Sequence, residues 1–321
     1  MAPARMMPEI TMPEIVISEF MNDVDVGGLS LDYDVLYDPQ LVDDPERLTA
    51  LLGDCRGLIV RNRTMVTAAM INAAPRLEVI GRLGVGLDNI DLDAAAERGI
   101  KVCPAVGANA ASVAEYVLLA MLHLLRPLTH ATPPMLAGTF PRAEFSHGRE
   151  IGGKVLGLIG GGMIGAALAQ RARALDIEVI ITDPGLTPET TPDGCRLVTL
   201  EDLLHQADVI SLHVPLNAAT RGMVDAAMLS QMKQGAIVIN TARGGIIDHA
   251  ALAAKLREGH LGGAAIDVFE EEPASADSLS MFDGMENLIL SPHIAGLTVE
   301  SNARVAAMTA AQVRNVLENG T

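Results

Sequence analysis

Short apolar runs alternate with amphipathic segments along most of the chain. Runs of the strand type lie at residues 15–18, 57–60, 79–81 and 101–103, and again at residues 155–159, 178–182, 209–212, 237–240, 263–267 and 288–290. The segments between them mostly show helical periodicity. Because short apolar strands separated by helices build parallel sheets, the pattern predicts an α/β fold with two doubly wound lobes.

Several of the helices have recognisable end signals. Asp44 and Pro45 are suited to the N-cap and first turn of a helix over residues 46–52, and Asp91 and Gly99 can bound one over residues 92–98. Ser112 has the capping-box spacing to a glutamate three residues on, which predicts that an apolar helix opens there and runs to residue 125. Further helices are predicted over residues 163–175, 248–258 and 298–317, and residues 126–150 are interpreted as an irregular arm.

Length and charge narrow the class of protein. A chain of 321 residues with 49% hydrophobic residues suits two domains with large cores, and a net charge of −17 disfavours binding to nucleic acid or to anionic membranes. No apolar stretch reaches the length of a membrane span, and the N-terminal stretch has no apolar signal core. The three cysteines are far apart, which fits neither a disulfide framework nor a zinc site. We expect a cytoplasmic protein without a metal.

A glycine-rich turn follows the strand predicted at residues 155–159. Gly160, Gly162 and Gly165 form the G-x-G-x-x-G pattern between that strand and a helix, which suits a tight turn, close approach to a pyrophosphate and close helix packing. The next strand ends at Asp183, whose carboxylate can accept hydrogen bonds from a ribose and would repel a 2′-phosphate. The pattern therefore predicts a dinucleotide site that prefers NAD over NADP.

Three further polar segments follow predicted strands, where open α/β sheets place their ligands. Arg243 stands between a strand end and two glycines and can grip a carboxylate through two hydrogen bonds. Residues 270–272 are three adjacent glutamates, among which the residues alone cannot choose. His293 follows a strand and a proline, and a lone histidine at such a place is more often structural than catalytic.

Taken together, these motifs resemble one family. Residues 81–91, 160–165, 211–216, 240–244, 267–273 and 291–296 stand in the order found in the D-isomer-specific 2-hydroxyacid dehydrogenases. The resemblance implies a Rossmann NAD-binding domain at residues 103–295, inserted into a flavodoxin-like substrate domain of residues 1–102 and 296–321. It also implies an active site in the cleft between the two domains, and a homodimer in which residues 126–150 form the arm.

The resemblance assigns roles to individual residues and selects the glutamate before the proline. The implied catalytic residues are Arg243, Glu272 and His293. The implied cofactor-binding residues are Gly160, Gly162, Met163, Ile164, Gly165, Asp183, His213, Val214, Pro215, Thr220, Thr241, Ala242, Asp267, His293 and Gly296. The implied substrate-binding residues are Arg61, Asn62, Leu83, Gly84, Val85, Arg243 and His293.

The substrate implied is a small 2-hydroxy or 2-oxo acid. Arg61, Arg63 and Arg82 stand near the predicted substrate loops of an otherwise acidic chain, which suggests a substrate with a second anionic group. Two dianions fit, 3-sulfolactate and 3-phosphoglycerate. Residues 61–64, 81–91 and 291–302 most resemble the bacterial (S)-sulfolactate dehydrogenases of the family. Glyoxylate or hydroxypyruvate reduction stays open as an alternative, as does the more remote role of an NAD-sensing corepressor.

Overall fold

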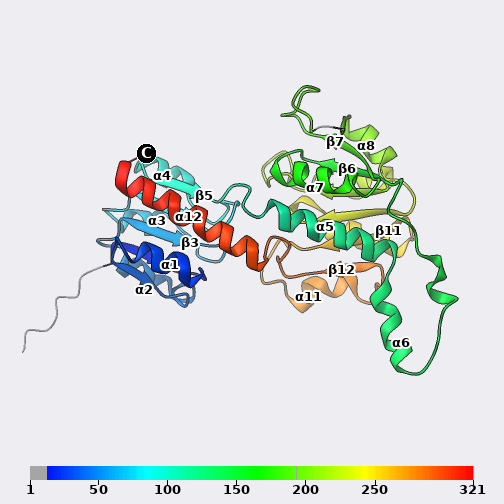
Figure 1. Ribbon diagram of the computed structural model, residues 1–321, viewed down its shortest axis with the longest axis horizontal. Coiled ribbons are helices and arrows are strands. Elements are labelled where there is room, and N and C mark those ends of the chain that lie inside the picture. Colours follow the sequence, from blue (N-terminus) through cyan, green and yellow to red (C-terminus); the bar gives the residue numbers. More distant parts are fainter. Residues whose placement is uncertain (1–12, 193, 321) are drawn as a thin grey trace, which may run out of the picture. The chain divides into compact units, whose positions relative to one another are not determined.

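The computed structural model describes residues 13–192 and 194–320, which form two compact units (Figure 1). Unit 1 comprises residues 13–109 and 298–320, and unit 2 comprises Ala110–Leu297. Each unit carries helices over a parallel sheet, so the predicted doubly wound α/β fold is confirmed. Residues 1–12, for which the sequence predicts no signal core, lie outside the described residues.

The sheet of unit 1 has five parallel strands in the order β2-β1-β3-β4-β5, which is the order of flavodoxin-like folds. The edge strand β2 was not predicted, since three half-buried residues make too short a pattern. The strands are β1 (Ile15–Ile17), β2 (Val35–Tyr37), β3 (Gly57–Val60), β4 (Val79–Arg82) and β5 (Lys101–Pro104).

Alternate residues of these strands supply two separate cores, because successive strand side chains point to opposite faces. Val16 packs with one set of helices, whereas Ile15 and Ile17 pack with the other. The first set is α2 (Pro45–Leu51), α3 (Ala68–Asn72) and α4 (Leu92–Glu97); the second is α1 (Asp23–Leu29) and the final helix α12 (Val299–Asn319).

The sheet of unit 2 has seven parallel strands in the order β12-β11-β10-β9-β6-β7-β8. Counted from β6, the order contains the 3-2-1-4-5-6 arrangement of dinucleotide-binding folds, extended by one strand. Only the two-residue strand β8 was not predicted. The strands are β6 (Val155–Ile159), β7 (Glu178–Thr182), β8 (Arg196–Leu197), β9 (Val209–Leu212), β10 (Ala236–Asn240), β11 (Leu261–Ile266) and β12 (Leu288–Leu290).

Helices cover both faces of this second sheet (Figure 1). One face carries α5 (Ala110–Leu125) and α7 (Met163–Arg173), and the other carries α8 (Leu200–Gln206), α9 (Ala226–Gln231) and α10 (His249–Arg257). The shorter helices are α6 (Thr132–Leu136) and α11 (Ala276–Leu279), and 3-10 turns occur at Leu41–Asp43, Leu128–Ala131, Glu144–His147, Gly244–Ile246 and Ser280–Phe282.

Two sequence-based predictions need correction. The capping box at Ser112 was wrong: α5 already begins at Ala110, and Ser112 is a buried residue inside the helix. The earlier start extends the buried face of the helix back through Val113 to Ala110 at the spacing of one helical turn. Residues 126–150 are also less irregular than predicted, since they contain α6 and two 3-10 turns.

The boundaries between the two units lie a few residues after the predicted domain limits of 102/103 and 295/296. Ala105 and Ala108 lie in a core of unit 1, and Ala108 O accepts a hydrogen bond from Arg304 of α12. Residues 103–109 therefore pack with the first unit, and the change occurs at Asn109 and again at Leu297.

Among the residues that the structure describes, no single helix has both the length and the apolar composition of a membrane span. One bent pair, Ala110–Leu125 with Leu128–Leu136, meets those criteria only when its two members are taken together.

Candidate active site

The glycine turn after β6 has the geometry that the motif requires. Gly160 adopts a φ of 103°, and a Cβ there would lie 2.6 Å from the carbonyl oxygen of His213. A Cβ on Gly165 would lie 2.5 Å from the carbonyl oxygen of Gly160, so α7 packs directly on the turn. Around Gly162, by contrast, a Cβ would meet nothing within 4 Å. The turn is therefore closed at its ends and open in the middle.

The open glycine is also the N-cap of α7. Gly162 has no side chain to cap the helix, and the predicted cofactor residues Met163 and Ile164 form its first turn. The unpaired N–H groups and the helix dipole at such an end favour a phosphate.

Asp183 lies directly beyond the end of β7 and fixes the turn from the side. Its Oδ2 accepts a hydrogen bond from the N–H of Gly161, and its Oδ1 accepts one from the N–H of Gly185, both at 2.8 Å. A carboxylate has about four acceptor positions, so these two bonds leave capacity for ribose hydroxyls.

A second predicted cofactor segment follows β9 and lies against the glycine turn. His213 donates its N–H to Ile159 O at 2.8 Å, and Val214 lies beside the site of a Gly160 Cβ. Burial lowers the pKa of His213 to about 4, so the imidazole is neutral at pH 7. The segment is closed by Thr220, whose hydroxyl donates to Pro215 O at 2.6 Å.

The loop after β10 carries Thr241, Ala242 and Arg243, and the buried Asn240 holds it. Asn240 accepts from the N–H of Ala242 at 3.0 Å and donates to Arg243 O at 2.8 Å. The hydroxyl oxygen of Thr241 is buried and has no hydrogen-bond partner among the described residues. A buried unpaired hydroxyl is costly, so this group is suited to a bond with a bound molecule.

Glu272 and His293 are 21 positions apart and are joined in the structure. His293 Nδ1 lies 2.7 Å from Glu272 Oε2, while Glu272 Oε1 accepts from the N–H of Phe269 at 3.0 Å. Burial opposes ionisation of Glu272, but these hydrogen bonds and the charge of Arg243 outweigh it, so the pKa of Glu272 lies below its ordinary value. The carboxylate is therefore ionised at neutral pH and can accept the Nδ1 proton.

Arg243 belongs to the same region of unit 2. The following residue, Gly244, packs so tightly on the Phe269–Glu270 backbone that a Cβ there would lie 2.0 Å from the Phe269 carbonyl carbon. Arg243 Nη1 donates to Ala242 O at 2.6 Å. The structure thus brings a guanidinium, a carboxylate and an imidazole together from three separate loops.

Asp267, at the end of β11, is buried and supports the histidine loop. Its Oδ1 accepts from Ser291 Oγ at 2.6 Å and from Ile294 N at 2.8 Å, and its Oδ2 accepts from Ala295 N at 2.8 Å. Burial raises the pKa of Asp267, and these hydrogen bonds offset part of that rise. The last predicted cofactor residue, Gly296, directly follows this loop and is half-buried.

In unit 1, the predicted substrate loop after β3 is held by a buried carboxylate that the sequence analysis missed. Glu19 accepts from the N–H groups of Arg61, Arg63 and Thr64 at 2.8, 3.2 and 2.9 Å. The guanidinium of Arg61 donates through Nη2 to Asn302 of α12 at 2.7 Å, and burial lowers the pKa of Arg61. The sequence feature that could have indicated Glu19 is its position just after a buried strand, where open α/β sheets place ligand-facing groups.

The other predicted substrate residues take several positions in unit 1. Asn62 is exposed, Leu83 is buried, and Val85 is partly exposed at 37%. The N–H of Gly84, a predicted substrate-binding residue, donates to Arg82 O at 2.7 Å. Because the Gly84 N–H already has this partner, the backbone N–H of the neighbouring Val85 is better placed to bind a substrate.

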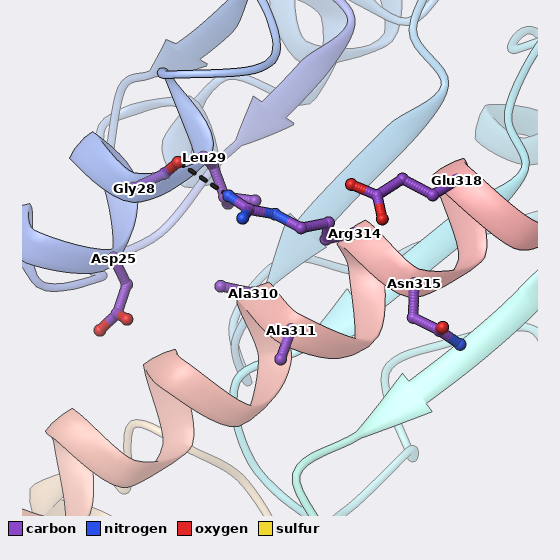
Figure 2. Close-up of a pocket in the computed structure, with 8 residues that line it drawn as sticks. All are labelled: Asp25, Gly28, Leu29, Ala310, Ala311, Arg314, Asn315 and Glu318. Carbon is purple, nitrogen blue, oxygen red and sulfur yellow. Dashed lines mark hydrogen bonds between the residues drawn. The ribbon is translucent and has the colours of Figure 1, made fainter.

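A surface depression of about 330 Å³ lies between α1 and α12 (Figure 2). No predicted site residue lines it. Its arginine, Arg314, donates to Gly28 O at 2.8 Å and pairs with Asp32 at 3.0 Å, so this charge joins the two helices. The lining residues are Asp25, Gly28, Leu29, Ala310, Ala311, Arg314, Asn315 and Glu318.

Comparison with known proteins identifies the scaffold. Residues 118–295 match the NAD binding domain of D-isomer specific 2-hydroxyacid dehydrogenases. The chain is also 48% identical to an (S)-sulfolactate dehydrogenase of Chromohalobacter salexigens, over 95% of this chain and 99% of that one. The chain belongs to the D-isomer specific 2-hydroxyacid dehydrogenase family. The resemblance inferred from the motifs is thereby confirmed.

Two further relatives show the range of this 2-hydroxyacid dehydrogenase family. A D-3-phosphoglycerate dehydrogenase of Mycobacterium bovis is 37% identical over 96% of this chain, which spans only 57% of that protein. The crystal structure of an Aquifex aeolicus D-lactate dehydrogenase complexed with NAD and lactic acid superposes with a TM-score of 0.80 at 28% identity, covering 95% of each chain.

The dehydrogenase is therefore an NAD-dependent oxidoreductase that interconverts a 2-hydroxy acid and its 2-oxo acid. The residues present suit the cofactor. The cap-free N-terminus of α7, the open space at Gly162 and the unpaired Thr241 hydroxyl offer donors and room for a dinucleotide.

Proposed function

We propose that this dehydrogenase interconverts (S)-3-sulfolactate and 3-sulfopyruvate. The observation that carries the proposal is the 48% identity to an (S)-sulfolactate dehydrogenase across nearly the full length of both chains. Stereochemistry is compatible, because sulfur raises the priority of the sulfomethyl group above the carboxylate. The arrangement named D in lactate is then named S in sulfolactate.

The proposed proton chemistry follows from the pairing of His293 with Glu272. An ionised carboxylate only accepts hydrogen bonds, so Nδ1 carries the proton and Nε2 of the neutral ring has a free lone pair. Nε2 takes the proton of the 2-hydroxyl during oxidation and returns it during reduction. Glu272 holds the ring in this tautomer and stabilises its protonated form. NAD, when bound, supplies the hydride acceptor.

Arg243 is proposed to bind the carboxylate next to the reacting carbon. A guanidinium can donate two parallel hydrogen bonds to a carboxylate, which fixes the orientation of the substrate as well as its charge. The cofactor residues are proposed to divide their work. The glycine turn takes the pyrophosphate, Asp183 takes the adenosine ribose, and Thr241 binds a cofactor group through its unpaired hydroxyl.

Arg61 is proposed as the group in unit 1 that binds the second anion. Its side chain is anchored by Asn302 at 2.7 Å and by Phe20 O at 3.5 Å, while the buried Glu19 fixes its backbone. A guanidinium has five N–H donors, so these two side-chain bonds leave donors for a sulfonate. A cation whose solvation is already reduced by burial binds an anion more strongly than a fully hydrated one.

A second candidate substrate is 3-phosphoglycerate, which the 37% identity to phosphoglycerate dehydrogenases favours. Its phosphate would use the same cation. Glyoxylate and hydroxypyruvate lack a second anion, so a preference for them would leave Arg61 without a role in substrate binding.

The test is a panel of 2-oxo acids assayed with NADH and NADPH. We expect sulfopyruvate with NADH to give the highest kcat/KM among sulfopyruvate, phosphohydroxypyruvate, hydroxypyruvate, glyoxylate and pyruvate. Arg61→Gln should lower kcat/KM for sulfopyruvate by about 10- to 100-fold, the worth of a hydrogen bond to a charged group, and change that for pyruvate little.

Two outcomes would contradict the substrate proposal. A higher kcat/KM for phosphohydroxypyruvate would assign the enzyme to phosphoglycerate, and equal losses for pyruvate and sulfopyruvate in Arg61→Gln would remove the second-anion site. Arg47→Gln is a matched control, because Arg47 pairs with Asp38 on the exposed side of α2.

We also propose a cytoplasmic homodimer. Among the described residues, Cys55, Cys103 and Cys195 form no disulfide, which suits a reducing compartment. Leu122, Leu128, Leu136 and Phe140 of α5 and the following arm are exposed, three of them by more than three quarters, and a second copy would bury this apolar surface. A monomer in light scattering would disprove the dimer, and Leu136→Asp should dissociate it.

A further inference from the structure

We propose that Tyr116 is a positioning residue for His293, acting through Ser291 and Asp267. The inference rests on the proposed role of His293 in proton transfer. It adds a side chain from helix α5, which carries none of the residues assigned to the site so far.

The relay begins on a helix that packs beside the sheet. Helix α5 contacts β11, the strand that ends just before Asp267 (Figure 1). Tyr116 is half-buried on this helix, and its hydroxyl lies 2.5 Å from Ser291 Oγ. Ser291 in turn donates to Asp267 Oδ1 at 2.6 Å. Three side chains from α5, the loop after β12 and the end of β11 therefore form one continuous chain of hydrogen bonds.

The direction of the chain is fixed by counting protons. A serine hydroxyl has one proton, which Ser291 gives to the carboxylate of Asp267. The bond to Tyr116 must then run from the tyrosine to the serine oxygen. Burial raises the pKa of Tyr116, so the phenol keeps the proton that it donates. Removing this donor leaves the Ser291 oxygen without a donor to its lone pairs in a partly buried environment.

The end of the chain controls the backbone around the histidine. His293 has a φ of 55°, a conformation that residues other than glycine rarely adopt and that costs energy unless its surroundings impose it. Asp267 imposes it from both sides: its backbone oxygen accepts from His293 N at 2.7 Å, and its carboxylate accepts from Ile294 N and Ala295 N.

The orientation of Asp267 thus sets the position of the imidazole. The carboxylate has few alternatives, because it is 1% exposed and its bonding partners are the serine hydroxyl and the two N–H groups. If the serine rotates away, the histidine loop loses one of the bonds that keep Nδ1 facing Glu272. Tyr116 prevents that rotation.

The experiment compares Tyr116→Phe with Tyr37→Phe. Tyr37 is a matched control in unit 1, since its hydroxyl also makes a half-buried hydrogen bond, to Met21 O at 3.1 Å. We expect Tyr116→Phe to slow hydride transfer by about 3- to 10-fold in a single turnover followed by NADH absorbance, with KM and NADH affinity within about twofold. Tyr37→Phe should transfer hydride at the wild-type rate.

A double-mutant cycle separates positioning from simple packing. Ser291→Ala should slow hydride transfer more than Tyr116→Phe, and adding Tyr116→Phe to Ser291→Ala should cause no further loss, since the tyrosine acts only through the serine. Ser291→Thr, which keeps the hydroxyl, should restore most of the rate. The best oxo acid of the panel serves as substrate, so the assay does not depend on sulfopyruvate.

A wild-type single-turnover rate in Tyr116→Phe would overturn the inference, as would losses that multiply independently in the double variant. His293→Ala is measured in the same assay. If His293→Ala keeps its turnover, the proposed role of the histidine fails; if only Tyr116→Phe keeps it, the relay alone fails.

Discussion

Glu272 Oε2 and His293 Nδ1 are 2.7 Å apart, and this contact determines which ring nitrogen is available for chemistry. The carboxylate accepts at Nδ1, so Nε2 is the nitrogen that can exchange a proton with substrate. The same contact, together with the Phe269 N–H bond, keeps the pKa of Glu272 below its usual range despite burial. The pair is a carboxylate-oriented histidine.

Replacing either member of the Glu272–His293 pair should impair catalysis, although only His293 is proposed to contact the substrate. We expect His293→Ala to lower kcat by about 10²- to 10⁴-fold, which is the usual contribution of a positioned acid–base group. Glu272→Gln should also lose at least about 10-fold, because an amide can donate to Nδ1 and favour the wrong tautomer. Steady-state kcat at pH 7 is the measurement. Glu271→Gln, next to it in the sequence, is the control, and equal losses in both glutamine variants would refute the assignment.

Arg243 should act on substrate binding and not on the cofactor. Arg243→Ala removes the guanidinium proposed to hold the carboxylate, so kcat/KM for the oxo acid should fall by about 10²-fold or more. The Kd of NADH, measured by fluorescence titration, should stay within about twofold. A large loss of NADH affinity with unchanged oxo-acid kinetics would place Arg243 at the cofactor instead.

Two glycines of one turn should behave differently. Gly160→Ala puts a Cβ 2.6 Å from His213 O at a φ of 103°. The free energy of unfolding should therefore be about 1–3 kcal/mol lower than in the wild type. Gly162→Ala meets nothing within 4 Å and should alter the free energy of unfolding by less than about 1 kcal/mol. Its Cβ would nevertheless stand where a pyrophosphate approaches, so NADH binding should weaken. Unchanged NADH affinity in a folded Gly162→Ala would mean that the phosphates bind elsewhere.

The sequence predicted the elements far better than the contacts between them. Strands with continuous apolar runs were located to within two residues at each end, whereas β2 and β8, short and only partly buried, left no pattern. Ser112 was misplaced because a capping signal is local, while burial of Ala110 is decided by tertiary packing. Among the site residues, Glu272 and His293 were selected together through the family resemblance, but the atoms that join them could be named only from the structure.

The supporting residues were the least predictable part of the site. Nothing in the spacing links Tyr116 to Ser291, which is 175 positions away, or Arg61 to Asn302, 241 positions away. A tyrosine in an apolar helix is an ordinary core residue until the fold shows a partner for its hydroxyl. Glu19 follows a buried strand, but its role in holding the loop after β3 became recognisable only once three backbone N–H groups were seen to converge on it.

His213 should make the stability of the cofactor-free enzyme depend on pH. Burial lowers its folded-state pKa from 6.5 to about 4, so between these values the unfolded chain binds more protons than the folded one. Stability conferred by the neutral ring is fully present above pH 6.5 and is lost as the pH falls toward 4. We expect Tm to drop over this interval, and His213→Gln, which can still bond to Ser211, should reduce the drop.

The control for this effect is His205→Gln, which alters an exposed histidine in the last turn of α8. Its Tm should follow the wild-type pH dependence, because this exposed side chain lies outside the loop after β9 that holds His213. If His213→Gln and His205→Gln both retain the full wild-type drop between pH 6.5 and 4, then His213 is protonated in the folded enzyme without penalty. In that case the loop after β9 opens to water, and the assignment of a neutral His213 imidazole beside the glycine turn is wrong.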